Sequence, residues 1–178
     1  MEWMKKAAVV AAVVALAWAA MPGTAPAQGI SPLQIGIGGR DLQLAPVENT
    51  VVPLRLSLPF SENAAVYGLD FGIFAKADKA TAVQLNLFNF VEGPSAGVAL
   101  AIYHTSKEHY GVTLAPFNYV DGVHAGIQLG FFPKADTVYG LQFGAINRAR
   151  VLHGVQLGLV NILDSSDYPF MPVLRVGF

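Results

Sequence analysis

The sequence predicts an all-β protein, an antiparallel up-and-down meander closed into a transmembrane β-barrel of 8–10 strands, with ten favoured. Three observations predict this fold class. A short frame of residues recurs along the chain, apolar residues alternate with small or polar ones inside each copy, and charged residues are few. Only 13% of the residues are charged, about half the usual share in a soluble domain. Alternation with a period of two indicates strands and not helices.

The repeated frame reads Gly, apolar, Gln, apolar, Gly, apolar, apolar, Asn. Seven copies of it follow one another at a nearly constant spacing, in which shorter and longer steps almost alternate. One unit can hold a strand of about 9–10 residues and a turn, and about 9–11 residues is the length of a tilted transmembrane strand. The copies are GLDFGIF (68–74), AVQLNLFN (82–89), GVALAIYH (97–104), GVTLAPFN (111–118), GIQLGFFP (126–133), GLQFGAIN (140–147) and GVQLGLVN (154–161).

The turns between the copies fall into two alternating classes. VEG at 91–93 recurs as VDG at 120–122, two copies later, and KAD at 76–78 recurs at 134–136, four copies later. Successive turns of a meander lie at opposite ends of the sheet, so this alternation indicates a hairpin unit of about 28–29 residues, repeated over about 66–162. A β-solenoid is the alternative, but a chain with one strand in each coil would have no reason to alternate its corners.

Three further strands complete the predicted barrel. PLQIGIGG (32–39) and VVPLRLSLPF (51–60) precede the repeats, and MPVLRVGF (171–178) follows them. The count is then ten, and an even number is typical of closed antiparallel barrels in bacteria. Eight strands are an alternative if the first two are irregular, and so is an open sheet that closes only by oligomerising.

The two faces of each strand predict what each face meets. Leu, Val, Ile and Phe occupy one face, and Gly, Gln, Ala, Thr and Asn occupy the other. A soluble barrel with an apolar interior would leave the second face in water almost without charge, whereas soluble sheets normally charge their exposed face. We therefore expect the apolar face to meet lipid and the polar face to line a lumen, because lipid requires every backbone group to be paired within the protein.

The first residues predict export. Two lysines precede an apolar run at 7–20, and Ala25 and Ala27 frame a small-residue cleavage site. Such a segment is typical of a secretory signal peptide and is short for a membrane span. Residues 1–27 are therefore predicted to be cleaved, and residues 28–178 to form a single β-barrel domain. An N-terminal anchor helix is the alternative.

Composition argues against several kinds of partner and scaffold. The chain has 11 Lys and Arg and 12 Asp and Glu, and removing Lys5, Lys6 and Glu2 leaves 9 against 11. No basic stripe exists, so we expect no nucleic-acid partner. The chain has no cysteine, so it is neither a lipoprotein anchored through an N-terminal Cys nor a disulfide scaffold.

Two segments resemble known bacterial proteins. The repeats, over about 66–162, resemble bacterial surface-repeat proteins built from tandem G-[VL]-Q-[LF]-G-x-x-N units, which implies a secreted or surface-exposed protein. The last strand resembles the C-terminal signature of bacterial outer-membrane barrels, with Phe178 at the end and Val176 and Leu174 on the same face. This resemblance implies recognition by the barrel-assembly machinery, outer-membrane lipid as a partner, and a location in the outer membrane of a diderm bacterium.

Four charged residues lie on the predicted inward face: Arg55, Asp70, Arg175 and Arg40. They belong to strands that become neighbours when the barrel closes. Asp70 is expected to pair with Arg55, with Arg175 as a further candidate, because an isolated charge in a narrow lumen is costly. The cluster is interpreted as a set of structural salt bridges at the seam, or alternatively as a constriction or anion-binding spot inside a pore.

The histidines are not expected to form a catalytic site. One predicted outer loop contains His104, Ser106, Glu108 and His109. Residues so close in sequence rarely adopt the geometry of a catalytic triad, so we interpret them as a solvated loop, with metal binding as the alternative. His124 and His153 are interpreted as interface residues. The sequence has no phosphate loop, dinucleotide motif or clustered metal-ligand spacing, so no enzyme activity, metal or cofactor is expected.

These inferences lead to one main functional hypothesis and two alternatives. The main hypothesis is a non-enzymatic outer-membrane β-barrel with a structural or surface-interaction role. The first alternative is a narrow pore for small solutes or ions, lined by the inward charges. The second is an enzyme at the barrel rim that acts on lipid through His104 and Ser106.

Overall fold

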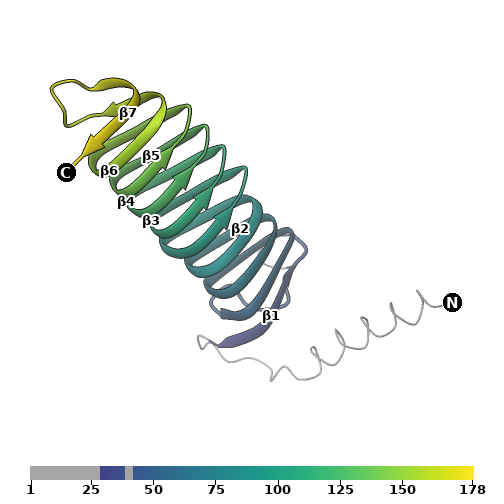
Figure 1. The fold of residues 1–178 in the computed structure, drawn as a ribbon. Coiled ribbons are helices and arrows are strands. Elements are labelled where there is room, and N and C mark those ends of the chain that lie inside the picture. The colour runs from purple at the N-terminus through teal and green to yellow at the C-terminus, as the bar shows by residue number, and fades with distance from the viewer. Residues whose placement is uncertain (1–28, 39–41) are drawn as a thin grey trace.

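The coils of the chain stack into an elongated column (Figure 1). The computed structural model describes residues 29–38 and 42–178. One end of the column holds β1 (Ile30–Gly36), and the other end holds β7 (Phe170–Gly177). The predicted signal peptide, residues 1–27, lies outside the described residues.

Strands β1 to β7 form one sheet in sequential order. The strands between its ends are β2 (Thr50–Leu100), β3 (Tyr103–Leu114), β4 (Phe117–Leu129), β5 (Phe132–Phe143) and β6 (Ile146–Leu163). Each neighbouring pair from β1 to β6 is parallel, whereas β6 and β7 are antiparallel. β2 is long because its strand pairing continues through several coils.

The predicted fold class was wrong. A mostly parallel sheet whose segments stack coil upon coil is a β-solenoid, and the antiparallel meander closed into a transmembrane β-barrel of 8–10 strands is overturned by the parallel pairing. The sheet is not closed on itself, because β1 and β7 lie at opposite ends of the column (Figure 1). The alternative that the turn pattern disfavoured is therefore the observed one.

The alternation of shorter and longer steps between the repeats has a local cause. Between β2 and β3 the register shifts after Val91, so that Glu92 and Gly93 lie opposite the single residue Lys107. A similar shift follows Val120 between β4 and β5, whereas β5 and β6 pair without a shift. An extra residue in one strand of a pair forms a β-bulge. VEG and VDG are therefore bulged corners of the longer coils, and not the turns of hairpins.

A row of glycines allows successive coils to approach closely at one corner. Gly97, Gly111, Gly126, Gly140 and Gly154 pair in register. Their φ angles lie between +109° and +150°, a region that glycine adopts far more readily than residues with a Cβ. A Cβ on Gly126 would overlap the carbonyl oxygen of Gly111. The requirement for glycine at this corner explains why the repeated frame begins with that residue.

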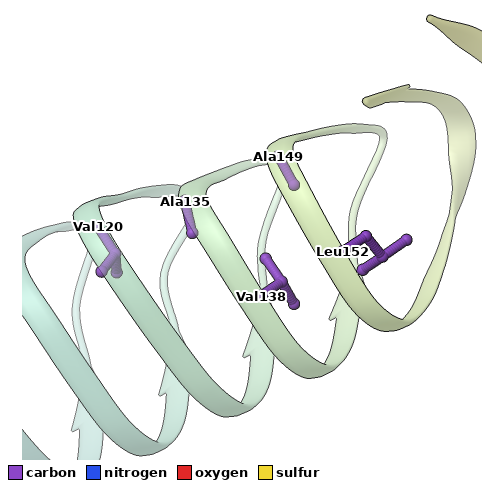
Figure 2. Close-up of a cluster of buried hydrophobic side chains, with 5 residues drawn as sticks. All are labelled: Val120, Ala135, Val138, Ala149 and Leu152. Atoms are coloured by element: carbon purple, nitrogen blue, oxygen red, sulfur yellow. The ribbon is translucent and has the colours of Figure 1, made fainter. Parts of the chain in front are cut away.

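One part of the column's interior is apolar. Val120, Ala135, Val138, Ala149 and Leu152 form a buried cluster, and Figure 2 shows their side chains pointing into the interior from successive coils. The register stacks Val120 on Ala135 and Ala135 on Ala149, and it stacks Val138 on Leu152. Small and branched side chains thus fill the space between facing segments of each coil.

Another part of the interior is polar. Gln128, Gln142 and Gln156 are fully buried and stack in register. The Gln142 side chain donates from Nε2 to Gln128 Oε1 at 2.9 Å, and Gln156 Nε2 donates to Gln142 Oε1 at 2.6 Å. Asn147 donates in the same way to Asn161 at 2.7 Å. The polar face of the strands is therefore buried, but it forms a side-chain ladder and not the wall of a lumen.

Replacing Gly126 by alanine should prevent the normal stacking of β3 on β4. The substitution adds both a strained φ and an overlap with Gly111, and we expect it to lower the free energy of unfolding by more than about 2 kcal/mol. Gly38→Ala is the matched control, because Gly38 also has a positive φ but no atom lies within 4 Å of the added Cβ. Urea unfolding monitored by circular dichroism measures both; equal losses would contradict the stacking argument.

Replacing Gln142 by alanine should also destabilise the column. The change removes the acceptor of Gln156 and the donor to Gln128, and unpaired buried polar groups cost about 1–3 kcal/mol each. Leu141→Ala alters the adjacent outward side chain, which is 40% exposed, and should cost about 1 kcal/mol or less. The same urea titration compares the two variants. A larger loss from Leu141→Ala would show that the ladder contributes little.

Candidate functional site

Two rows of apolar side chains run along the outside of the column, on the strands whose inward residues form the glutamine ladder. We call these rows together the apolar face. In β2 to β7 the first row, in register, contains Val98, Val112, Ile127, Leu141, Val155 and Val176. The second row contains Leu100, Leu114, Leu129, Phe143, Leu157 and Leu174. The antiparallel strand β7 therefore extends the same two rows.

The apolar face continues to the other end of the column. Leu33 and Ile35 of β1 pair with Leu54 and Leu56 of β2. Inside β2, the hydrogen bonds from Arg55 to Asp70 show that these two residues occupy equivalent positions in successive coils. The outward residues of the coils within β2 are Leu69, Phe71, Val83 and Leu85. The face thus spans ten strand segments, which at about 4.8 Å apart make it about 43 Å long.

The apolar face is open to solvent and has no charge. The exposed fractions of its most exposed members, among them Leu114, Ile127 and Phe143, lie between 38% and 56%. No residue in the two rows is charged. Tyr67, Tyr110 and Tyr139, each directly before a corner glycine, lie along one edge of the face and are exposed. An apolar surface of this extent on a protein indicates an interaction site.

Another side of the column carries charged residues. Lys134 and Arg148 are in register, Arg148 contacts Asp164 at 3.2 Å, and Arg150 contacts Asp136 at 3.1 Å. Near the bulged corners, a surface cavity of about 460 Å³ is lined by Lys76, Phe90, Val91, Glu92, Thr105, Ser106, Lys107 and Asp121. A barrel would have divided these charges between its two rims, whereas the solenoid places them away from the apolar face.

Arg55 and Asp70 form a fully buried ion pair in the interior. The guanidinium donates from Nε to Asp70 Oδ1 at 2.8 Å and from NH2 to Oδ2 at 2.6 Å, and its NH1 donates to the backbone oxygen of Lys76 at 2.7 Å. Asn86 and Gln84 also donate to Asp70. With these bonds the pair is a bidentate, well-satisfied contact between two coils, and it lines no channel.

Arg175 does not join that pair. It lies in β7 at the opposite end of the column, where its NH2 donates to the backbone oxygen of Tyr168 at 2.8 Å and its NH1 to that of Pro169 at 3.1 Å. The seam that was expected to join Arg175 to Asp70 does not exist, because the sheet does not close. Arg40 lies outside the described residues.

The predicted assembly signal falls on β7. Leu174 and Val176 belong to the apolar face, and Phe178 at the end of the chain is fully exposed. Whether the barrel-assembly machinery binds this strand stays a prediction. The shared face of Leu174 and Val176 follows from their pairing with Leu157 and Val155.

The interpretation of residues 104–109 as a solvated loop was wrong. His104, Ser106 and His109 lie in strand β3 and are buried. His109 stacks on His124 with ring centroids 5.4 Å apart, and it meets His104 edge-on at 5.4 Å. His153 lies elsewhere, stacked on Tyr139 at 4.8 Å.

The row position of the histidines could have revealed their burial. His109 and His124 occupy the same register row as Val138 and Leu152 of later coils, one repeat further along the chain at each step. Residues in that row of the repeat point into the column. The sequence interpretation missed this because it assigned the segment to a turn.

Burial keeps the three clustered histidines neutral. It lowers the pKa of His104 to about 3, that of His109 to about 4 and that of His124 to about 3, and the neighbouring imidazoles also oppose protonation of His104 and His124. Nδ1 of His104 contacts the Asn89 amide at 3.2 Å, and Nδ1 of His109 contacts the Ser95 hydroxyl at 2.7 Å. Neutral imidazoles in these surroundings act as packing groups in the column.

The described residues contain no cluster of three or more His, Cys, Asp or Glu side chains that could hold a metal ion. Within residues 29–38 and 42–178, no helix is long and apolar enough to cross a membrane. The arrangement as a whole offers an extended apolar surface for noncovalent contact.

Comparison of the chain with protein-family models, with curated proteins and with solved structures finds no match. The candidate site therefore rests on the geometry of the column itself.

Acid should destabilise the column through the three buried histidines. In the unfolded chain the pKa of a histidine is about 6.5. In the folded column the pKa values of the three histidines are about 3 to 4. Unfolding therefore takes up protons, and stability falls as pH decreases from about 6.5 toward about 3, by up to about 4 kcal/mol per pH unit for three histidines. Urea unfolding between about pH 4 and about pH 7 measures this slope.

His124→Val supplies the matched variant for the pH experiment. Valine already occupies this row at position 138 in the next coil, so the packing should be retained. Losing one buried imidazole should reduce the change of the unfolding free energy with pH by up to about 1.4 kcal/mol per pH unit. An unchanged slope would mean that acid acts through other groups.

Proposed function

We propose that this protein is an exported, non-enzymatic surface protein that attaches to a lipid membrane through its apolar face. The observation that carries the proposal is the uncharged face itself, formed by two rows of Val, Leu, Ile and Phe over ten strand segments. The protein would lie on the membrane without spanning it. The signal-peptide pattern of residues 1–27 and the resemblance to bacterial surface-repeat proteins support export, with the outer membrane as the expected site.

The size of the face supports membrane binding energetically. A half-exposed Leu or Phe side chain that leaves water contributes about 1 kcal/mol. Binding with micromolar affinity needs about 8 kcal/mol beyond the costs of association. Twenty apolar side chains therefore provide enough stabilisation even if only part of each one is buried in lipid.

The edges of the face favour lipid over a second protein sheet. The exposed tyrosines Tyr67, Tyr110 and Tyr139 carry hydroxyl groups at one edge, and tyrosine is typical of membrane interfaces. At the other edge Phe131 and Leu159 are 62% and 75% exposed, more than the residues of the two rows. Such protruding corners would hold a flat sheet beyond the packing distance of about 10 Å, whereas fluid acyl chains can surround them.

Two features of the column favour a surface role over a pore or a rim enzyme. A pore needs a lumen, and the interior is filled by the glutamine ladder, the Arg55–Asp70 pair and the apolar cluster. A rim enzyme would need His104 and Ser106 to reach substrate together; Ser106 lines the surface cavity, but His104 is fully buried. A structural or surface-interaction role requires neither feature.

Placing lysine on the apolar face should release the protein from membranes. We expect residues 28–178, the chain that remains after the predicted cleavage, to float with phosphatidylcholine vesicles, which have no net charge. Leu114→Lys and Phe143→Lys together should weaken vesicle binding by about tenfold or more for each substitution, since each one removes an apolar contact and adds a charge. Flotation in a sucrose gradient measures the bound fraction.

Ile146→Lys is the matched control. Ile146 has a similar exposure, 39%, but lies two residues from Arg148 in β6 and so shares its outward side. This variant should float like the unchanged chain. Equal flotation of both variants would overturn the proposal, as would vesicle-independent assembly that the Leu114 and Phe143 substitutions abolish, because a second copy would then cover the face.

A further inference from the structure

The two ends of the column are capped differently. At the first end, residues 42–49 fold against β1 and β2: Leu44 N donates to Ile35 O at 2.9 Å, and Ala45 N donates to Gln34 Oε1 at 2.6 Å. At the last end, β7 is the outermost strand of the described sheet. Its outer edge therefore offers backbone groups that no described strand pairs, and such edges template pairing with another chain.

Beside the polar loop at 164–167, the last end also carries a large exposed apolar surface, which a terminal repeat normally replaces with polar residues. The exposed large apolar residues of β7 and its flanks are Tyr168, Phe170, Met171, Val173, Leu174, Val176 and Phe178. Val173 is 69% exposed although it lies in the middle of the strand. An uncovered apolar edge of this kind is unfavourable in water.

Arg175 and the loop before β7 cover the interior at this end of the column. Arg175, which is only 6% exposed, points inward opposite Gln156 and donates to the backbone oxygens of Tyr168 and Pro169. The loop that ends at Pro169 thus covers the end of the interior, but not the outer edge of β7. The remaining surface to be covered is the edge strand itself.

We infer that two copies of this chain join end to end by antiparallel pairing of their β7 strands. In a two-fold contact residue i of one copy meets residue j of the other, and j meets i, so an exposed charge near the axis would lie close to its own copy. The charged side chain in β7, Arg175, is turned inward and bonded, so no such repulsion arises. Leu174 and Val176 instead meet Leu174 and Val176 of the partner.

This pairing joins the two apolar faces. Directly opposite residues of paired strands point to the same side of a sheet, so the rows that contain Leu174 and Val176 continue into the second copy. The dimer would present one uncharged surface of twice the length on one side. The inference goes beyond membrane attachment and rests on a separate observation, the uncovered edge of β7.

Single cysteines in β7 test the pairing, because the natural chain has none. Opposite residues of antiparallel strands have Cα atoms about 4.5–5.5 Å apart, a span that a disulfide can bridge. Leu174→Cys alone, Val176→Cys alone, or a mixture of the two should form a disulfide-linked dimer of the full chain in nonionic detergent. Ile30→Cys, exposed at the opposite end of the column, is the control and should link neither to itself nor to Val176→Cys.

Molar mass from light scattering provides the second measurement. It is made on the Leu114→Lys, Phe143→Lys chain, whose apolar face is charged, so that the result does not depend on membrane attachment. We expect twice the mass of one chain, and we expect Val173→Asp to restore the single-chain mass by placing two carboxylates at the contact. The inference would be overturned by a single-chain mass together with the absence of β7 crosslinks. It would also be overturned by crosslinks between Ile30→Cys and Val176→Cys together with masses larger than the dimer.

Discussion

The hydrogen-bonded stacking of identical side chains inside the column is the interaction on which the rest of the structure depends. Gln128, Gln142 and Gln156 bond to one another only because parallel coils place the same repeat position directly above itself. Amide ladders of this kind satisfy polar groups away from water and penalise any slip of register. The ladder therefore fixes both the parallel pairing and the choice of the buried face.

The apolar outer surface follows from that choice. Side chains of a strand alternate between two faces, so a strand that buries Gln142 must expose Leu141 and Phe143. The repeat carries this arrangement through ten segments, while charged residues such as Arg148 and Arg150 fall on the segment after the next corner. The column is amphipathic across its width, which suits attachment along one side.

The sequence was sufficient to locate the strands and the repeat but not the topology. The ten segments read from the alternation are the ten that form the apolar face, yet a period of two is the same in parallel and antiparallel sheets. The bulges at Glu92 and Asp121 recur at every second coil, so in the sequence they look like the alternating turns of hairpins. The recurrence of Gly and Gln at one repeat position was the signal for stacking, since only parallel coils bring Gly126 onto Gly111 and Gln142 onto Gln128.

Interior and surface of the column can vary independently. The interior row that contains Val138 and Leu152 changes to His109 and His124 in the middle coils, yet the outward row passes over these coils unchanged, from Val112 to Ile127. In stacked repeats, stability is set mainly by each repeat and its nearest neighbours. We therefore expect acid to open the column first at the histidine coils, which lie in the middle of the continuous apolar face. The outward side chains of these coils remain suited to the same contact as those of every other coil.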